Sequence, residues 1–166
     1  MNWQVKQLER EVTSWPGVTA HSHRFAGREF RVGDAEIGHV HVGGVVDIPF
    51  TRAMREALLA QGWAEEHRWV PDSGWTTFHI RRKDQLQHAI WLMRLSYARY
   101  AIKKSGEPQK SFEKESLELE LREPFLSLLR KFVPRVAEEA GYLLESEPVA
   151  ATATQLTEDA RREAGK

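Results

Sequence analysis

The chain has 166 residues, of which 41% are hydrophobic and 29% charged. This length and composition are typical of one globular domain with its own core. The 24 Lys and Arg side chains balance 24 Asp and Glu side chains, so no net charge attracts the chain to nucleic acid or to an anionic membrane. The chain has no cysteine, which excludes disulfides, thiolate metal ligands and thiol nucleophiles. We expect a small-molecule ligand as the partner, and the oligomeric state stays open.

No segment has the pattern of a targeting or membrane-spanning sequence. The first ten residues lack the apolar stretch of a signal peptide, and no later run approaches the roughly 20 apolar residues that cross a bilayer. A cytoplasmic location is therefore the default expectation.

The N-terminal part predicts a helix followed by three short strands. Residues 2–14 carry apolar side chains at near-helical spacing, and Pro16-Gly17 ends this element. From Val18 to Phe50, β-branched and aromatic residues are interrupted by glycines, as in consecutive strands of a sheet. The strands are expected at residues 18–25, 28–32 and 35–42.

Two helices and a hairpin are predicted next. Thr51 is a suitable N-cap for a helix over residues 51–61, and Gly62 lies where a left-handed C-terminal cap belongs. The turn chemistry of Pro71-Asp72-Ser73-Gly74 then joins two strand-like runs. These elements are the strands 63–70 and 75–81, followed by an amphipathic helix over residues 84–103.

The turn-forming residues Ser105-Gly106-Glu107-Pro108 separate two parts of the chain that differ in sequence pattern. Residues 1–105 are predicted to form an α+β domain in which a single antiparallel sheet packs against two or more helices. Residues 106–145 are expected to form a C-terminal extension of strand and helix packed on this domain, and residues 146–166 a flexible tail. Within the extension, the alternation of Leu and Glu over 117–121 favours an edge strand, and a helix from Phe112 onward is the alternative. A further helix is expected to begin at Pro124.

Histidines are concentrated in the predicted sheet. His39 and His41 are two residues apart, so a strand places both imidazoles on one face, together with Ile37. His67 and Trp69 are expected to share a face of the next strand. The same argument places Trp75, Thr77 and His79 together, whereas five apolar residues are assigned to the core: Leu58, Phe78, Ile80, Ile90 and Met93.

If these faces meet, the imidazoles form a concave site walled by tryptophan. A neutral imidazole is a good general base or metal ligand near pH 7. Carboxylates that can orient the rings are available at Glu36, Asp47, Glu65 and Glu66. The predicted catalytic residues are His39, His41 and His67. The predicted ligand-binding residues are Glu36, Asp47, Trp63, Trp75 and Thr77.

Simpler explanations exist for each histidine. A His-x-His pair on a strand often faces solvent or only hydrogen-bonds. His21 and His23 flank a basic stretch and are expected on a solvated face, and His88 is expected to pack in the core. A zinc or iron site at His39, His41 and His67, with a carboxylate as a further ligand, is an alternative because these are suitable ligand types.

Four short motifs occur in order along the chain. They are Glu36-Ile37-Gly38-His39-Val40-His41, Gly62-Trp63 followed by His67, Trp75-Thr76, and Ser96-Tyr97. Together they resemble the luciferase-like domain shared by fungal luciferases and by bacterial proteins of unassigned function. The similarity covers roughly residues 17–100, and its specificity comes from the order of motifs that are weak individually.

The resemblance implies a function for the histidines. In the fungal enzymes this domain is linked to oxygenation of a hydroxylated styryl-pyrone, with loss of carbon dioxide and emission of light, without a metal or organic cofactor. It implies His39, His41 and His67 as the polar centre and an enolic or phenolic ligand, with no cofactor. This chain has Asp47 where the fungal proteins carry a further histidine, and no counterpart of their membrane-anchor stretch is expected in it. Light emission is therefore not expected, and a non-catalytic ligand-binding domain stays an alternative to an oxidoreductase.

Overall fold

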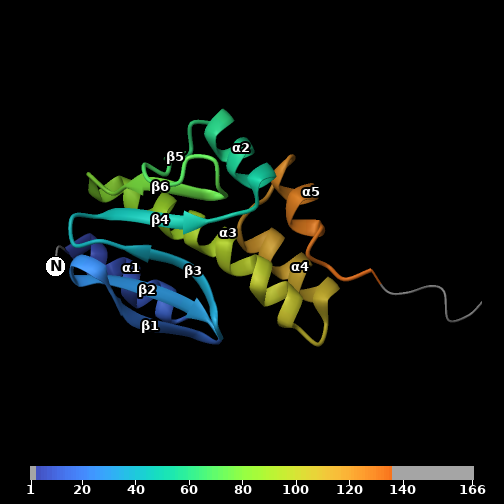
Figure 1. Cartoon of the computed structure of the whole chain (residues 1–166). Coiled ribbons are helices and arrows are strands. Elements are labelled where there is room, and N and C mark those ends of the chain that lie inside the picture. Colours follow the sequence, from blue (N-terminus) through green and yellow to red (C-terminus); the bar gives the residue numbers. More distant parts are fainter. Residues whose placement is uncertain (1–2, 136–166) are drawn as a thin grey trace, which may run out of the picture. The chain divides into compact units, whose positions relative to one another are not determined.

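One six-stranded sheet forms the centre of the protein (Figure 1). A computed structural model describes residues 3–135. Each strand pairs with its neighbours in antiparallel fashion, in the order β1-β2-β3-β4-β6-β5. This confirms the predicted α+β class with a single antiparallel sheet. The strands are β1 (Val18–His23), β2 (Gly27–Val32), β3 (Ala35–Val40), β4 (Val45–Pro49), β5 (Glu65–Glu66) and β6 (Trp75–His79).

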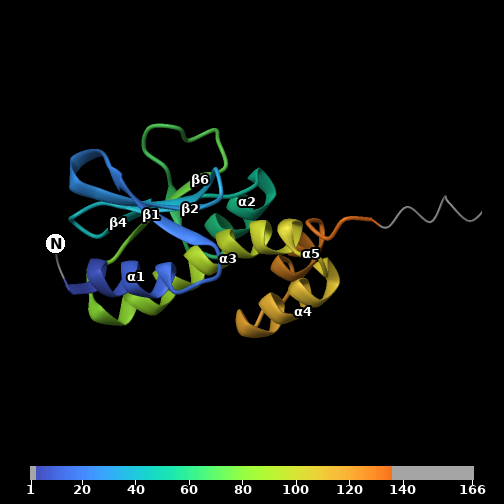
Figure 2. The same cartoon turned by 90° about the horizontal axis from the view of Figure 1, so that it is seen from below.

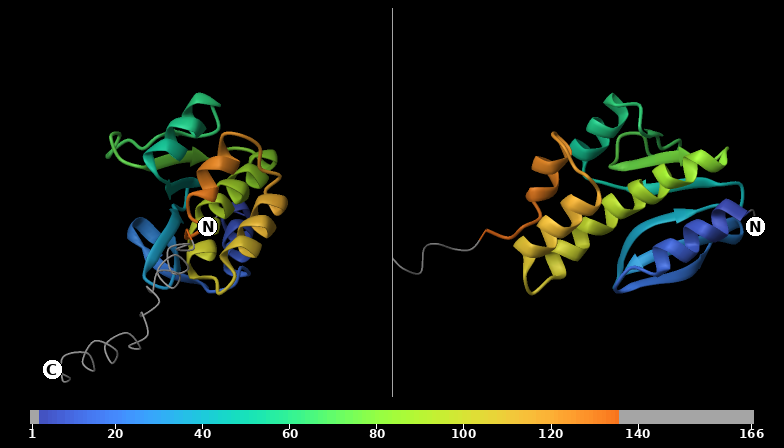
Figure 3. Two further views of the ribbon diagram at one scale, coloured as in Figure 1. Left: turned by 90° about the vertical axis from the view of Figure 1, so that its right-hand side faces the viewer. Right: turned by 180° about the vertical axis from the view of Figure 1, so that it is seen from behind.

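The described part of the chain has five α-helices, and two of them cover one face of the sheet. Viewed from below, α1 and α3 lie on the same side of the strands (Figure 2). Seen from behind, α3 crosses the sheet, and α4 and α5 lie near the C-terminal end of α3 (Figure 3). None of the described helices is long and apolar enough to cross a bilayer. The helices are α1 (Trp3–Thr13), α2 (Arg52–Ala60), α3 (Leu86–Lys104), α4 (Pro108–Glu118) and α5 (Phe125–Arg130).

The hydrophobic core lies between the sheet and these helices. Leu58, Ile80 and Met93 are buried in it, and Phe78 and Ile90 pack against it in partly buried positions. All five predicted core residues are therefore in contact with the core. Polar side chains lie on the other face of the sheet, which α1 and α3 do not cover.

The expected ends of α2 are confirmed. The Thr51 hydroxyl accepts a hydrogen bond from the Met54 backbone N–H at 3.2 Å, which caps the first turn. Gly62 has a φ of 66°, the left-handed conformation that glycine adopts without a steric penalty. Capping chemistry therefore predicted this helix within one or two residues at each end.

Two strand assignments differ from the sequence-based expectation. β4 was not predicted, because its five residues follow the Gly43-Gly44 turn directly and show no alternation of burial. The expected strand over 63–70 contains only the two residues of β5. Its apolar residues suggested a strand, but the Trp69 side chain is 77% exposed in the loop that joins β5 to β6. The apolar residues of segment 63–70 are therefore not buried as members of a strand.

The edge strand predicted over residues 117–121 is wrong, and the alternative helix is correct. Phe112, Glu115 and Leu119 are buried at helical spacing on or just beyond α4, whereas Leu117 is 79% exposed. The buried Glu115 carboxylate accepts two hydrogen bonds from the Arg94 guanidinium, at 2.6 and 2.9 Å. The Leu-Glu alternation concealed this helical period. The predicted flexible tail, 146–166, lies outside the described residues, as do 136–145 of the extension.

Gly38 lies at the point where β3 approaches α3. A Cβ atom on Gly38 would lie 2.7 Å from Met93 Sδ and 3.0 Å from the Asp47 carbonyl oxygen, and the φ of Gly38 is 145°. A side chain at this position therefore meets both a steric clash and an unfavourable backbone conformation. Glycine is required here for close packing of the sheet on the helix.

We expect Gly38→Ala to lower the free energy of unfolding by about 2 kcal/mol or more, because overpacking and backbone strain act together. Denaturant titration measures the change. Gly106→Ala is the matched control, since a Cβ there meets nothing within 4 Å and the φ is not positive. Equal stability of the two variants would contradict the assigned packing.

Candidate functional site

A row of polar side chains crosses the sheet on the face opposite α1 and α3. Residues directly opposite each other on paired strands place their side chains on the same face. The pairs are Glu29 with His39, His39 with Asp47, Asp47 with Thr77, and Thr77 with Glu65. Strand pairing thus brings residues from five strands into one line.

A β-bulge between β2 and β3 adds Glu36 to this face. Phe30 pairs with Gly38 and Arg31 pairs with Glu36, so Ile37 is the extra residue of the bulge. Glu36 Oε1 lies 2.6 Å from His39 Nδ1. The Ile37 side chain is fully buried in the core. The expectation that Ile37 shares a face with His39 is therefore wrong, because strict alternation fails at the bulge.

The buried Asp47 carboxylate is the centre of the site. Asp47 Oδ2 lies 3.3 Å from His39 Nε2, 3.3 Å from His41 Nε2 and 3.8 Å from His67 Nε2. The other oxygen, Oδ1, accepts a hydrogen bond from the Thr77 hydroxyl at 2.5 Å. The three histidines selected from the sequence thus converge on one carboxylate.

His67 reaches this centre from the loop after β5, not from a strand. Its Nδ1 accepts a hydrogen bond from the Trp69 backbone N–H at 3.2 Å. An acceptor nitrogen carries no proton, so the neutral His67 ring is protonated on Nε2, which faces Asp47. His67 and Trp69 therefore do not share a strand face as expected. The loop fixes the tautomer of His67 and directs its N–H towards the carboxylate.

His39 is placed to be a cation. Both of its ring nitrogens face carboxylates, Nδ1 towards Glu36 and Nε2 towards Asp47. Burial alone would lower the pKa of His39, but the hydrogen bonds and charges of Asp47 and Glu36 outweigh burial and raise the pKa to about 9. His39 is therefore an imidazolium at neutral pH.

His41 and Asp47 have lowered pKa values, for different reasons. Burial and the positive charge of His39 lower the pKa of His41 below its ordinary 6.5, although Asp47 acts in the opposite direction. Burial alone would raise the pKa of Asp47, but hydrogen bonds from His39 and Thr77 and the charge of His39 lower it. At neutral pH Asp47 is ionised and His41 is neutral. His41 then donates Nε2–H to Asp47 and keeps a lone pair on Nδ1.

A cavity of about 470 Å³ opens beside this centre. It is lined by His41, Asp47, His67 and Thr77, and its other walls include the exposed side chains of Phe25 and Trp69. Its volume falls in the range of small-molecule sites. The neutral histidine and the ionised aspartate are therefore accessible to a ligand, and the cationic His39 lies behind them.

The structure separates the two tryptophans that were assigned to the site. The Trp75 ring lies 5.4 Å from the His39 ring and 5.9 Å from the His67 ring. Trp63 lies elsewhere: its ring stacks on Phe125 of α5 at 5.3 Å. Trp75 thus supports the histidine cluster, and Trp63 belongs to the helical side of the protein.

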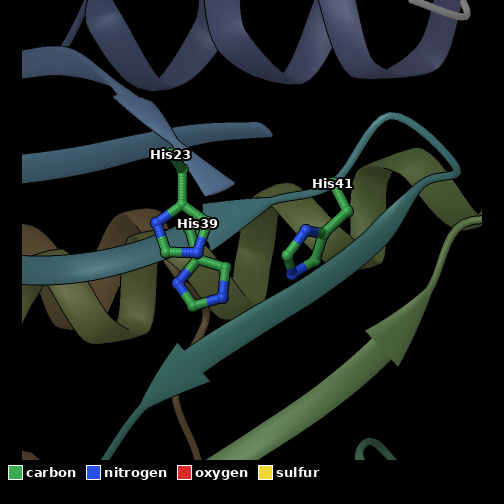
Figure 4. Close-up of side chains that lie close together, drawn as sticks. All are labelled: His23, His39 and His41. Atoms are coloured by element: carbon green, nitrogen blue, oxygen red, sulfur yellow. The ribbon is translucent and has the colours of Figure 1, made fainter. Parts of the chain in front are cut away.

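His23 was expected on a solvated face and is instead part of the cluster (Figure 4). Its ring stacks on His39 with centroids 3.9 Å apart, and its Nδ1 lies 3.2 Å from Glu29. His23 pairs directly with Gly27, which has no side chain to separate β1 from β3. The sequence offered one signal for this position: Gly27 lies opposite His23 in the hairpin expected from residues 18–32. Like His23, the pocket residues Phe25 and Trp69 were not assigned to the site.

The same cluster has the donor types of a metal site. One ring nitrogen each of His23, His39 and His41 lies within 4.8 Å of the others. This trio differs from the predicted ligands, because His67 is replaced by His23. His39, however, uses both nitrogens towards carboxylates. A metal ion would have to displace a proton from His39 and break one of these contacts.

Residues 34–96 match the family model of the Luciferase domain. The matched segment contains β3 to β6 and more than half of α3, and therefore includes His39, His41, Asp47 and His67. The match confirms the resemblance inferred from the sequence motifs. No curated protein and no solved structure was found to match the chain. The segment that is similar to this family thus contains the centre of the site.

The raised pKa of His39 predicts a pH-dependent stability. Its stabilising contribution is complete below the ordinary pKa of 6.5 and is lost as the pH rises through about 9. We expect the free energy of unfolding to fall between pH 7 and 9 by up to about 1.4 kcal/mol per pH unit. Denaturant titration across this range measures the decrease. His39→Gln should remove most of it, and His21→Gln, at an exposed position of β1, should not. A wild-type stability that stays constant over this range would contradict the assignment.

Proposed function

We propose that this luciferase-like domain binds a small molecule with an acidic enolic or phenolic hydroxyl, and that His41 removes the proton of that hydroxyl. The observation that carries the proposal is the pairing of neutral His41 with ionised Asp47 on the wall of the cavity. A base with an available lone pair and an orienting carboxylate is the arrangement that general-base catalysis requires.

The neighbouring histidines suit the anion that results. His67 directs Nε2–H into the same region, and a hydroxyl oxygen that loses its proton there gains a hydrogen-bond donor. His39 adds a positive charge behind Asp47. Deprotonation moves one proton from the ligand to His41 Nδ1, so the cavity then holds an anion beside a second imidazolium. Both charges are compensated at close range.

The rim of the cavity suits a flat aromatic ligand. Phe25 and Ala26 are consecutive non-glycine residues with φ values of 55° and 57°, a conformation that costs roughly 1 kcal/mol or more for each residue. This strained turn holds the Phe25 ring, which is 84% exposed, at the cavity. Trp69 lines the same cavity from the opposite loop. Two exposed aromatic rings can enclose a planar molecule.

The reaction that we propose for the bound anion is oxygenation without a cofactor. A carbon of the enolate forms a bond with O₂, so the carbon is oxidised and O₂ is reduced to a peroxide anion. The proton on His41 then moves to the terminal peroxide oxygen, and His41 becomes neutral again. The family resemblance and the general base support this step together, because ionisation is what makes an enol reactive towards oxygen.

Two other functions use the same residues. A domain that binds the anion without turnover would show ligand ionisation but no oxygen consumption with enolic pyrones. A metal site at the His23, His39 and His41 cluster is favoured by the spacing of its nitrogens. Metal content of the purified protein and the effect of a chelator on ligand binding distinguish this function from the first two.

Ionisation of a coloured phenol tests the proposal. 4-Nitrophenol absorbs visible light only as the phenolate, so we expect wild-type protein to increase the phenolate absorbance at a pH where most of the free phenol is protonated. His41→Gln should remove the increase, because amide nitrogens do not accept a proton. His21→Gln is the matched control and should retain it. An increase that persists in His41→Gln would reject His41 as the base.

A further inference from the structure

A second concave surface lies on the helical side of the protein, away from the histidines. Two cavities of about 350 and 600 Å³ share four lining residues, Trp91, Glu118, Leu119 and Glu120. They therefore form one depression between α3 and the C-terminal end of α4, which we call the helical groove. The sequence motifs placed Trp63 in a ligand site, and Trp63 lines this groove.

Aromatic rings form one wall of the helical groove. Trp63 and Trp91 meet edge to face, with ring centroids 5.4 Å apart, and His88 stacks on Trp91 at 5.9 Å. The Trp91 indole N–H donates to the Leu119 carbonyl oxygen at 3.0 Å, which fixes the ring against the end of α4. Trp63 stays 38% exposed. One face of the Trp63 ring stacks on Phe125, so its remaining surface is the part of this aromatic wall that a ligand can reach.

Negative charge surrounds these rings. The two cavities are lined by three carboxylates, of Glu11, Glu118 and Glu120, against the single guanidinium of Arg94. Arg94 pairs with Glu118 at 2.5 Å, so Glu118 is compensated. Within residues 3–135, Glu120 has no ion pair and is exposed. The C-terminal end of α4 adds the partial negative charge of its carbonyl groups.

We propose that the helical groove binds a small organic cation of the quaternary ammonium class. The face of a tryptophan ring attracts a cation through its quadrupole, and a nearby carboxylate strengthens the attraction. The chain uses this chemistry in the wall of the groove, where the Arg94 guanidinium lies 5.1 Å from the Trp15 ring centroid and 5.0 Å from that of Tyr97. This site is independent of the histidine cluster and of the reaction proposed there.

Choline and its neutral isostere 3,3-dimethylbutan-1-ol test the proposal, because they have the same shape and differ in charge. Two-dimensional ¹H–¹⁵N NMR of the full chain separates the six indole N–H signals, which Trp→Phe variants assign. We expect choline to shift the signals of Trp63 and Trp91 in a saturable manner and to leave Trp69, in the other cavity, unchanged. Equal shifts with the neutral isostere, or no shift at Trp63 and Trp91, would overturn the proposal.

A charge variant on the surface provides the second measurement. Glu120→Gln removes an exposed carboxylate that has no ion pair among the described residues, without touching the core, and it should weaken choline binding by about threefold or more. Glu113→Gln makes the same charge change on an exposed part of α4 outside the groove and should leave the affinity unchanged. Equal affinities of the two variants would overturn the role of Glu120. Circular dichroism of both variants confirms that α4 is intact.

Discussion

The buried Asp47 carboxylate is the group on which the polar face of the sheet depends. A carboxylate with so little solvent contact is stable only when its oxygens accept enough hydrogen bonds. Thr77 donates to one oxygen, and the Nε2 atoms of His39, His41 and His67 surround the other. Asp47, together with Glu36, holds His39 as a cation. Burial and the charge of His39 then keep His41 neutral, against the effect of Asp47. Identical side chains thus acquire different chemistry.

Backbone irregularities place these groups. The bulge at Ile37 turns Glu36 to the same face as His39, and the second carboxylate completes the environment that protonates the ring. Gly38 allows the strand to approach α3 at this point. The loop after β5 leaves the sheet after two paired residues and brings His67 over Asp47. The site therefore forms where the sheet departs from regular geometry, as is common for functional sites.

Much of this organisation was predictable from local patterns. The two-residue period placed His39 and His41 together, and capping residues defined α2. Prediction failed where tertiary contacts override the pattern. The bulge places the Ile37 side chain on the core face of the sheet, opposite to the face expected. In α4, the alternation of Leu and Glu conceals the helical period of the buried residues. His23 joins the cluster because Gly27 leaves a gap between strands, which depends on a register that sequence alone does not define.

The protonation pattern around Asp47 is the most direct test. ¹⁵N NMR of the imidazole nitrogens at pH 7 distinguishes the imidazolium from each neutral tautomer. We predict protons on both nitrogens of His39 and a single proton on Nε2 in His41. The neutral form of His67 should be the Nε2–H tautomer. In Asp47→Asn, His39 should lose its extra proton at a lower pH. A neutral His39 at pH 7 in the wild-type protein, or a proton on Nδ1 of neutral His41, would contradict the central role of Asp47.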